Sequence, residues 1–133
     1  MSTLLACMAT AAAFYGLPPA ALPSIAHVEG GNLGTVSYNK DGSADLGVMQ
    51  VNTRWTMPLA QSTGMTPVDV QKRLIYDGCF NIHAAAAILR TYLNEARGNV
   101  MLAIGYYHSH TPARNQEYQA KVLASARALF GSR

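Results

Sequence analysis

Glu29 is the first acidic residue of the chain, and the mostly apolar stretch 18–28 precedes it. A carboxyl group beside apolar surface loses solvation of its charged form, which raises its pKa. A carboxyl group that stays protonated at neutral pH can donate that proton to a glycosidic oxygen as a general acid. Gly30 and Gly31 follow at once, so they are predicted to end a helix and leave the backbone open to a ligand. Taken alone, Glu29 also fits a solvated glutamate at a helix end.

The polar segment 41–55 holds a second group of residues that could do chemistry. Asp45 lies within it, 16 residues after Glu29, on the return strand of the expected loop. A retaining glycosidase needs its two carboxyl groups about 5–5.5 Å apart, so hydrolysis is possible if Asp45 points into a cleft. The turn-forming neighbours of Asp45 favour the alternative, in which its carboxyl group caps a turn of the hairpin.

The elements that must position these residues are mostly helices. Apolar residues at helical spacing predict helices over 3–15, 18–29, 80–97, 99–108 and 113–130. A further helix is predicted to begin at Thr66, because a proline and an acidic residue follow this capping threonine. Turn-forming residues over 32–48 predict an irregular loop or a small hairpin with its tip at 40–43. We therefore expect one mainly α domain over residues 1–133, with a polar loop after the second helix.

Composition limits the class of protein. A chain of 133 residues with 50% hydrophobic and 13% charged residues is expected to fold as one compact domain. The net charge of +3 comes from scattered basic residues, which argues against a nucleic-acid partner, and no apolar run is long enough for a membrane span. The four histidines are dispersed and the calcium-like run 39–50 lacks its final glutamate, so we expect no metal and no cofactor.

The beginning of the chain and its cysteines bear on the compartment. No Lys or Arg precedes Lys40, so no export signal is recognised in the given chain, which fits a mature fragment whose signal has been removed. The two cysteines are Cys7 and Cys79. They could form one disulfide, which would stabilise the fold by about 4 kcal/mol, or remain as two buried thiols. Their spacing alone leaves both possibilities open.

Four motifs in order carry a resemblance to a known family. They are Glu29-Gly-Gly-Asn, Gly47-Val-Met-Gln-Val-Asn, Cys79-Phe-Asn-Ile and Tyr107-His-Ser. Through them, residues 5 to 130 resemble the soluble lytic transglycosylases, which are lysozyme-like, and especially the short domains associated with secretion and conjugation machines. The resemblance implies an α+β lysozyme-like fold, mainly α, with a small loop or hairpin beside an active-site cleft. It also implies a Cys7–Cys79 disulfide and a periplasmic or secreted location.

The resemblance implies a reaction as well. Glu29 would protonate the bond between two sugars of a peptidoglycan glycan strand, and the 6-hydroxyl of the muramic acid would then attack its own anomeric carbon. Glu29 would collect that hydroxyl's proton as a base, leaving a 1,6-anhydro end. Substrate contacts are expected at Ser37, Asp45, Met49, Gln50, Asn52 and Tyr107.

Each expected contact also fits an ordinary structural role. Tyr107 would hydrogen-bond Glu29 or the substrate's N-acetyl group, although it equally suits a core tyrosine. Met49 and Gln50 would line the floor of the cleft, while Trp55 and Tyr106 would stack on sugars or lie buried.

Two positions depart from the family pattern, and two other functions remain open. Gly30 replaces a serine and His108 replaces an asparagine, which affects substrate placement but not the acid. A lysozyme-type muramidase would hydrolyse the same bond with Asp45 as the second carboxylate. A module that binds glycan or a secretion-machine subunit without turnover is the other alternative. We expect a monomer whose partners are glycan strands and subunits of a secretion or conjugation machine.

Overall fold

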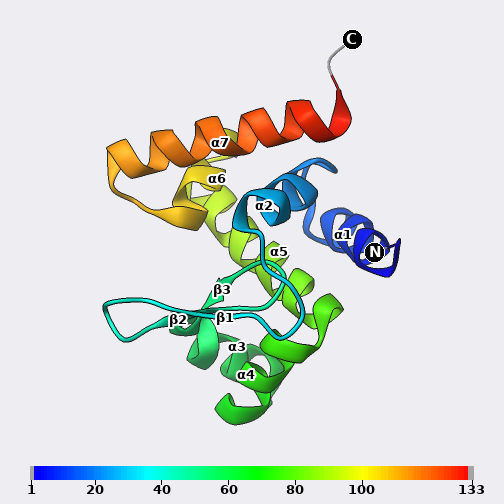
Figure 1. The fold of residues 1–133 in the computed structure, drawn as a ribbon, viewed down its shortest axis with the longest axis vertical. Helices are drawn as coiled ribbons and strands as arrows, with labels where there is room; N and C mark the ends of the chain where they lie inside the picture. Colours follow the sequence, from blue (N-terminus) through cyan, green and yellow to red (C-terminus); the bar gives the residue numbers. More distant parts are fainter. Residues whose placement is uncertain (1, 132–133) are drawn as a thin grey trace.

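A computed structural model describes residues 2–131, which form a mainly helical fold with one small sheet (Figure 1). The helices confirm the predicted fold class. Their bounds, in chain order with the strands, are α1 Ser2–Tyr15, α2 Ala21–Glu29, β1 Val36–Tyr38, β2 Ala44–Leu46, β3 Val51–Asn52, the 3-10 helix η1 Thr53–Trp55, α3 Thr56–Thr63, α4 Pro67–Tyr76, α5 Gly78–Glu95, α6 Val100–His108 and α7 Pro112–Phe130.

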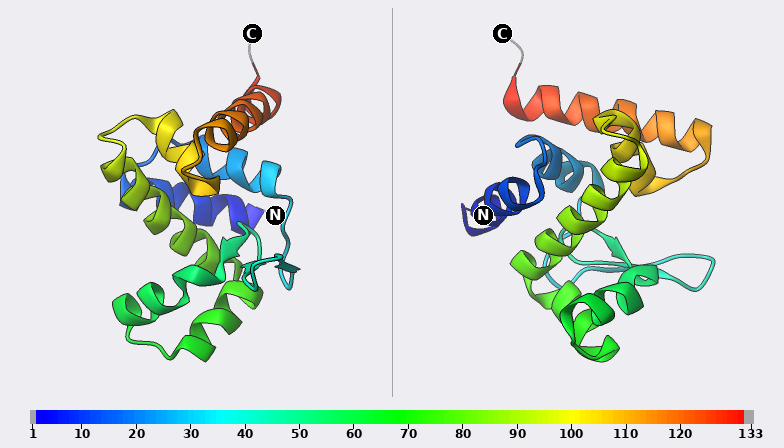
Figure 2. Two further views of the ribbon diagram at one scale, coloured as in Figure 1. Left: turned by 90° about the vertical axis from the view of Figure 1, so that its left-hand side faces the viewer. Right: turned by 180° about the vertical axis from the view of Figure 1, so that it is seen from behind.

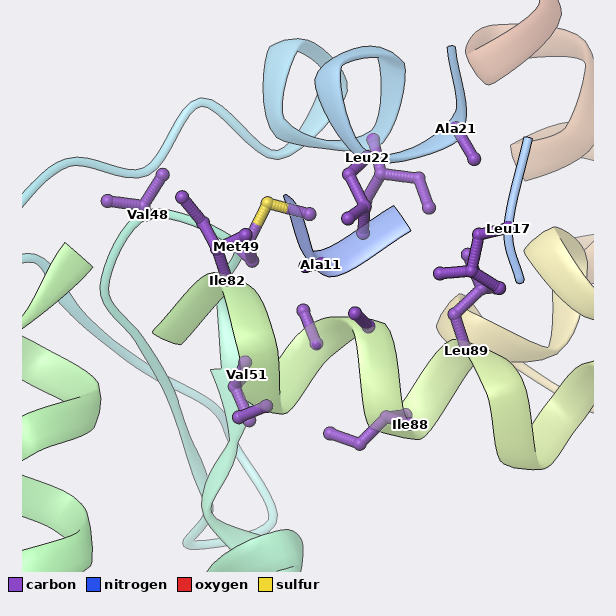
Figure 3. Packing of buried hydrophobic residues seen from close by; sticks show 14 of the residues in the cluster. Ala11, Leu17, Ala21, Leu22, Val48, Met49, Val51, Ile82, Ile88 and Leu89 are labelled. Atoms are coloured by element: carbon purple, nitrogen blue, oxygen red, sulfur yellow. The ribbon is translucent and has the colours of Figure 1, made fainter. Parts of the chain in front are cut away.

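Helix α5 is the central element, and it contacts α1, α2, α4 and α6. It begins after Asp77, whose carboxyl group caps the helix by accepting a hydrogen bond from the Phe80 amide. The small side chains of residues 84–86 are buried and let neighbouring helices approach closely. Figure 3 shows the core around α5, where side chains from α1, α2 and the segment 48–51 pack on the helix. The segment that follows the hairpin is thereby fastened to the helical core.

Helix α2 begins later than predicted. Residues 18–20 form a turn in which the Ala21 amide donates to the Pro18 carbonyl, so the helix itself starts at Ala21. Pro23 then falls in the first turn, where a backbone amide has no partner within the helix. The predicted end at Glu29 is confirmed, because Gly30 adopts a left-handed conformation with φ of 67° and closes the helix.

Gly31 serves a different purpose from the one its position suggested. A Cβ atom on this residue would lie 2.1 Å from the Gly47 carbonyl oxygen and 2.9 Å from the Val48 carbonyl oxygen. Because Gly31 has no side chain, the backbone of the segment after β2 can pack directly against the segment after α2. The expectation that the backbone is left open to a ligand is therefore not met at Gly31, whereas a Cβ atom at Gly30 would meet nothing within 4 Å.

The predicted loop is a hairpin whose two strands are joined by a turn over residues 39–43. Strands β1, β2 and β3 form an antiparallel sheet in that order, with Ser37 opposite Asp45 and Asp45 opposite Asn52. Strand β3 is only two residues long, too short for an alternating pattern to reveal it in the sequence. This register places Asp45 in the middle strand, beside Asn52.

Asn81 anchors the segment between β2 and β3 to the helices. Its side chain is fully buried, and its amide nitrogen donates to the carbonyls of Leu46 and Leu74, each at 2.8 Å. Its amide oxygen accepts a hydrogen bond from the Met49 backbone at 2.8 Å. Gly47 has φ of 70° and passes so close to Asn81 that a Cβ atom there would lie 2.5 Å from the amide nitrogen. One side chain thus holds the turn that leads into β3.

The Cys7–Cys79 disulfide joins α1 to the first turn of α5, with the two Cα atoms 5.5 Å apart. The pairing that the family resemblance implied is confirmed, and the alternative of two free thiols is wrong. The two cysteines are 72 residues apart in the sequence, so the bond closes a long loop that contains α2, the sheet, α3 and α4.

The hairpin and the start of α7 project to the same side of the molecule, one below and one above, as Figures 1 and 2 both show. Helix α5 connects the two regions. Helices α6 and α7 pack on each other, and α7 also packs on α2. Among the helices of residues 2–131, none combines the length and the apolar character needed to cross a membrane.

Candidate active site

A polar groove of about 310 Å³ lies between the hairpin side and the α6–α7 side of the molecule. It brings together side chains that are far apart in the sequence. Its lining residues are Glu29, Asn39, Asp41, Ser43, Asp45, Gln50, Val51, Asn52, Arg54, Trp55, Ile88, Tyr107, His108 and Arg114. The groove therefore contains Glu29 together with most of the positions that the sequence singled out.

Glu29 is the last residue of α2, and its side chain is partly buried. Burial raises the pKa of its carboxyl group above the ordinary value of 4.5, and the nearby carboxylate of Asp45 adds to the rise. A hydrogen bond from Tyr118 and the charge of Lys121 act in the opposite direction without cancelling it. The rise that the apolar sequence around Glu29 predicted is therefore present, and desolvation is its main cause.

Tyr118 is the partner of Glu29 that sequence reasoning missed. Its hydroxyl donates a hydrogen bond of 2.5 Å to the Glu29 Oε2 atom, and its ring is 5% exposed. Burial and the adjacent carboxylate hold the pKa of the Tyr118 hydroxyl far above its ordinary value, so this hydroxyl remains a donor. In the sequence, Tyr118 belongs to the apolar stripe of the last helix, and nothing in that stripe distinguishes it from a core residue.

Within residues 2–131, Tyr107 makes no hydrogen bond to Glu29, which was one of the two expected partners. Its hydroxyl donates to the backbone carbonyl of Met49 at 2.9 Å, and burial raises the pKa of that hydroxyl well above its ordinary value. Tyr118 takes the expected place because α7 packs against α2, which carries Glu29. Tyr107 still lines the groove, and its hydrogen bond joins α6 to the Met49 backbone.

The Met49 side chain lies in the core and does not line the groove. It is fully buried, and Figure 3 shows it among the side chains of Ala11, Leu22 and Ile82. Its backbone contributes instead, because its amide is held by Asn81 and its carbonyl by Tyr107. The expectation that the Met49 side chain forms the cleft floor is corrected, since apolar neighbours on α1, α2 and α5 enclose it.

Asp45 faces the groove and does not cap the hairpin turn. Asn52 donates to its Oδ1 atom at 2.9 Å, and Asn39 donates to its Oδ2 atom at 3.3 Å. The capping residue is Asp41, whose Oδ1 atom accepts hydrogen bonds from the amide and the hydroxyl of Ser43. The hairpin therefore presents a hydrogen-bonded carboxylate to the same groove as Glu29.

Gln50 lines the groove, whereas Ser37 does not. Gln50 has φ of 53°, a left-handed conformation that is uncommon for a residue with a side chain. Its backbone amide and its side-chain amide both donate to the Gly47 carbonyl, which stabilises this turn. Ser37 lies on β1 opposite Asp45, at the outer edge of the sheet. The left-handed backbone of Gln50 lies beside the groove, and strain at such a place is frequently a functional feature.

The two candidate stacking residues have different surroundings. Trp55 lines the groove and makes an edge-to-face contact with Tyr92, with ring centroids 5.9 Å apart. Tyr106 lies outside the groove lining and stacks on His110, with centroids 4.1 Å apart.

His108, which replaces the family asparagine, lines the groove and stacks on Tyr118. Burial and the nearby charges of Lys121 and Arg114 lower the pKa of His108.

Within residues 2–131, no three or more His, Cys, Asp or Glu side chains gather in a way that could hold a metal ion. The groove offers instead one carboxyl group with a raised pKa, two hydrogen-bonded carboxylates, and several amides and guanidinium groups. These groups are suited to proton transfer and to binding a polar ligand.

Comparison with known proteins shows which family the chain belongs to. A family model described as the transglycosylase SLT domain matches residues 6–128, which covers the groove and the core. The chain belongs to the SLT domain family. The resemblance carried by the four sequence motifs is thus confirmed over nearly the whole chain.

Two relatives of this SLT domain come from Salmonella and Shigella. The chain is 29% identical to the invasion protein IagB of Salmonella typhimurium (strain SL1344) over 102 residues, which are 74% of this chain and 60% of IagB. It is 30% identical to the protein IpgF of Shigella flexneri over 108 residues, which are 80% of this chain and 67% of IpgF. The matched region thus spans about three-fifths of the length of IagB.

Proposed function

We propose that this SLT domain is a peptidoglycan lytic transglycosylase that cleaves the β-1,4 bond between N-acetylmuramic acid and N-acetylglucosamine. The observation that carries the proposal is the Glu29 carboxyl group, which is partly buried in a polar groove, has a raised pKa and accepts a hydrogen bond from Tyr118. A carboxyl group in this state can still hold its proton when the pH is above 4.5.

Glu29 acts first as an acid. It transfers its proton to the glycosidic oxygen as the bond to the muramic acid C1 atom breaks, and positive charge develops on the sugar ring. The substrate's own N-acetyl group stabilises that charge, so a second carboxylate is not required. The hydrogen bond from Tyr118 to Oε2 leaves Oε1 to carry the transferred proton.

Glu29 then acts as a base. Its carboxylate accepts the proton of the muramic acid 6-hydroxyl while that oxygen bonds to C1, which closes the 1,6-anhydro ring. The carboxyl group is thereby regenerated and no water is consumed. Gln50 and Asn52 line the groove beside this centre and provide polar groups that would position the sugar, with Asp45 as a further contact.

Hydrolysis is a second candidate reaction, and Asp45 is the observation that favours it. Its carboxylate faces the groove and lies close enough to raise the pKa of Glu29. A carboxylate at this place on the hairpin could stabilise the cation or attack it, as in a retaining muramidase. The product then carries a full-mass reducing end instead of an anhydro end.

The place of action is proposed from the disulfide and the relatives. A Cys7–Cys79 bond suits an oxidising compartment, where the peptidoglycan also lies. The name of IagB links that protein to invasion. We infer that this SLT domain opens the wall locally outside the cytoplasm, where a secretion or conjugation machine is assembled.

The test is to incubate the purified protein with peptidoglycan sacculi and weigh the released muropeptides by mass spectrometry. Products lighter than reducing ends by one water support the transglycosylase, and full-mass ends support the muramidase. Binding without release of products would support a non-catalytic module and contradict both enzymatic functions.

A further inference from the structure

We propose that Arg54 and Arg114 bind carboxylates carried on the 3-O-lactyl arm of the muramic acid residues, so that the groove prefers anionic glycan strands to neutral ones. This inference rests on the proposed function, because it concerns the substrate of the same groove. It adds a specificity that the catalytic carboxyl group does not provide.

The two arginines lie on opposite sides of the groove. Arg54 belongs to η1, which follows β3 on the hairpin side, and Arg114 belongs to the first turn of α7. Figure 1 shows the hairpin side in the lower part of the molecule and α7 in the upper part. Residues from both parts line the groove. A strand that passes Glu29 would therefore meet one guanidinium group on each side.

The acidic groups of the groove already have protein partners. Glu29 accepts from Tyr118, Asp41 accepts from Ser43, and Asp45 accepts from two asparagine amides. Their capacity to hold an arginine side chain is therefore partly used within the protein, and no ion pair joins them to an arginine in the described chain.

The guanidinium groups of Arg54 and Arg114 differ in this respect. Within residues 2–131 they make neither a hydrogen bond nor an ion pair, and the only bond of Arg54 comes from its backbone amide. Arg73 and Arg90, outside the groove, do have partners: Arg73 pairs with Asp77, and Arg90 donates to Asn94. The charge of Arg54 contributes to the lowered pKa of Asp41, but within residues 2–131 neither guanidinium group has a hydrogen-bond partner. The groove thus presents two forked donors, which match the two oxygens of a carboxylate.

The ligand follows from the chemistry of the strand. N-acetylglucosamine carries no charge, whereas each muramic acid bears a lactyl arm that ends either in a carboxylate or in a peptide with carboxylates of its own. Asp41 and Asp45 would repel such a strand, and the two arginines offset that repulsion. A neutral chitin oligosaccharide would gain nothing from either guanidinium group.

Binding is measured in a Glu29→Gln background, so that cleavage does not consume the ligand. Three ligands are compared: strands that retain their peptides, strands from which an amidase has removed the peptides, and chitohexaose. We expect the double variant Arg54→Ala/Arg114→Ala to bind carboxylate-bearing strands about tenfold more weakly at low salt, since each exposed pair contributes modestly. Binding of chitohexaose should stay within about twofold, and the tenfold difference should shrink as salt is raised.

Arg127→Ala is the matched control, because Arg127 is an exposed arginine on α7 that does not line the groove. It should leave all three affinities unchanged. A replacement of both groove arginines by lysine should recover part of the affinity, because the charge returns without the forked geometry.

The outcomes separate this inference from the proposed function. A loss confined to peptide-bearing strands assigns the carboxylates to the peptide, and a loss confined to stripped strands assigns them to the lactyl group; both support the inference. An equal loss for chitohexaose, or no loss for any ligand, overturns it. If the wild-type protein binds strands selectively but releases no products, the catalytic proposal fails while the arginine assignment stands.

Discussion

At the scale of single residues, the state of Glu29 depends on two opposed influences. Desolvation favours the protonated form of its carboxyl group, and the Tyr118 hydroxyl favours the ionised form. The proposed roles of Glu29 as acid and then as base require both forms. The pairing of a partly buried carboxyl group with one buried phenol provides this balance.

Glu29→Gln should lower the rate of product release from sacculi by at least about 100-fold, because the proton donor is lost. The protein should stay folded, since the glutamine oxygen can still accept the Tyr118 hydrogen bond. Glu117→Gln is the control, because Glu117 is an exposed glutamate on α7 outside the groove. Retained activity in Glu29→Gln would mean that another group is the acid.

The same variant has a predictable effect on stability. The folded-state pKa of Glu29 lies above its ordinary value of 4.5, so the carboxyl group favours folding when protonated, and this contribution is lost as the pH rises through the folded pKa. Glutamine does not titrate. Glu29→Gln should therefore raise the melting temperature relative to wild type at pH 8, and the gain should diminish as the pH falls toward 4.5. A gain that grows in acid would contradict the raised pKa.

Tyr118→Phe removes the donor that lowers the Glu29 pKa. The pKa should rise further, so the basic limb of the pH–rate profile should move to higher pH, and the stability should fall by about 1 kcal/mol. Tyr107→Phe is the matched control, because its hydroxyl contacts the Met49 carbonyl and not Glu29. Equal shifts of the limb in both variants would contradict the specific role of Tyr118.

At the scale of elements, the segment between β2 and β3 depends on a helix that lies more than thirty residues later. Asn81 provides the two donors and the acceptor that this segment and the end of α4 require. The motif Cys79-Phe-Asn-Ile marks Asn81 in the sequence without revealing its partners. The helix thereby positions Gln50, which follows the anchored Met49 amide.

Asn81→Leu should lower the free energy of unfolding by about 3–5 kcal/mol, because it leaves a buried amide and two buried carbonyls without partners. Urea unfolding measures the change. Asn94→Leu on the same helix is the control, since Asn94 is exposed and its side chain hydrogen-bonds to Arg90 alone within residues 2–131. It should change stability by less than about 1 kcal/mol. A change below about 1 kcal/mol in Asn81→Leu would show that the segment is held by other contacts.

At the scale of the whole molecule, the groove exists because segments from both ends of the chain meet. Helix α7 packs on α2 and brings Tyr118 to Glu29 across 89 positions of sequence. The hairpin faces them from the opposite side, and α5 sets the separation. The disulfide contributes by joining α1 to α5, the helix that supports both the hairpin side and the α6–α7 side of the groove.

Replacing both Cys7 and Cys79 by serine should lower the free energy of unfolding by about 4 kcal/mol, because the bond closes a loop of 72 residues and restricts the unfolded chain. Denaturant unfolding of the variant and the wild type measures this difference. Thiol titration of the unfolded, unreduced wild-type protein should detect no free thiol. Two reactive thiols would contradict the disulfide.

Much of this protein can be derived from the sequence because the relevant signals are short-range. Helical spacing and caps predict the start of α4 and the bounds of α5, α6 and α7 within a few residues, and turn-forming residues predict the hairpin. The apolar surroundings of Glu29 predict the direction of its pKa shift. The four motifs identify the family.

Only the tertiary structure decided which groups meet. Tyr118 and not Tyr107 reaches Glu29, Asp45 turns to the groove while Asp41 caps the turn, and the Met49 side chain enters the core. These outcomes depend on how helices and strands distant in sequence pack together, and the spacing of residues along one element holds no information about that packing. A tyrosine on an apolar helical stripe has the same local pattern whether its hydroxyl meets a carboxylate or a backbone carbonyl.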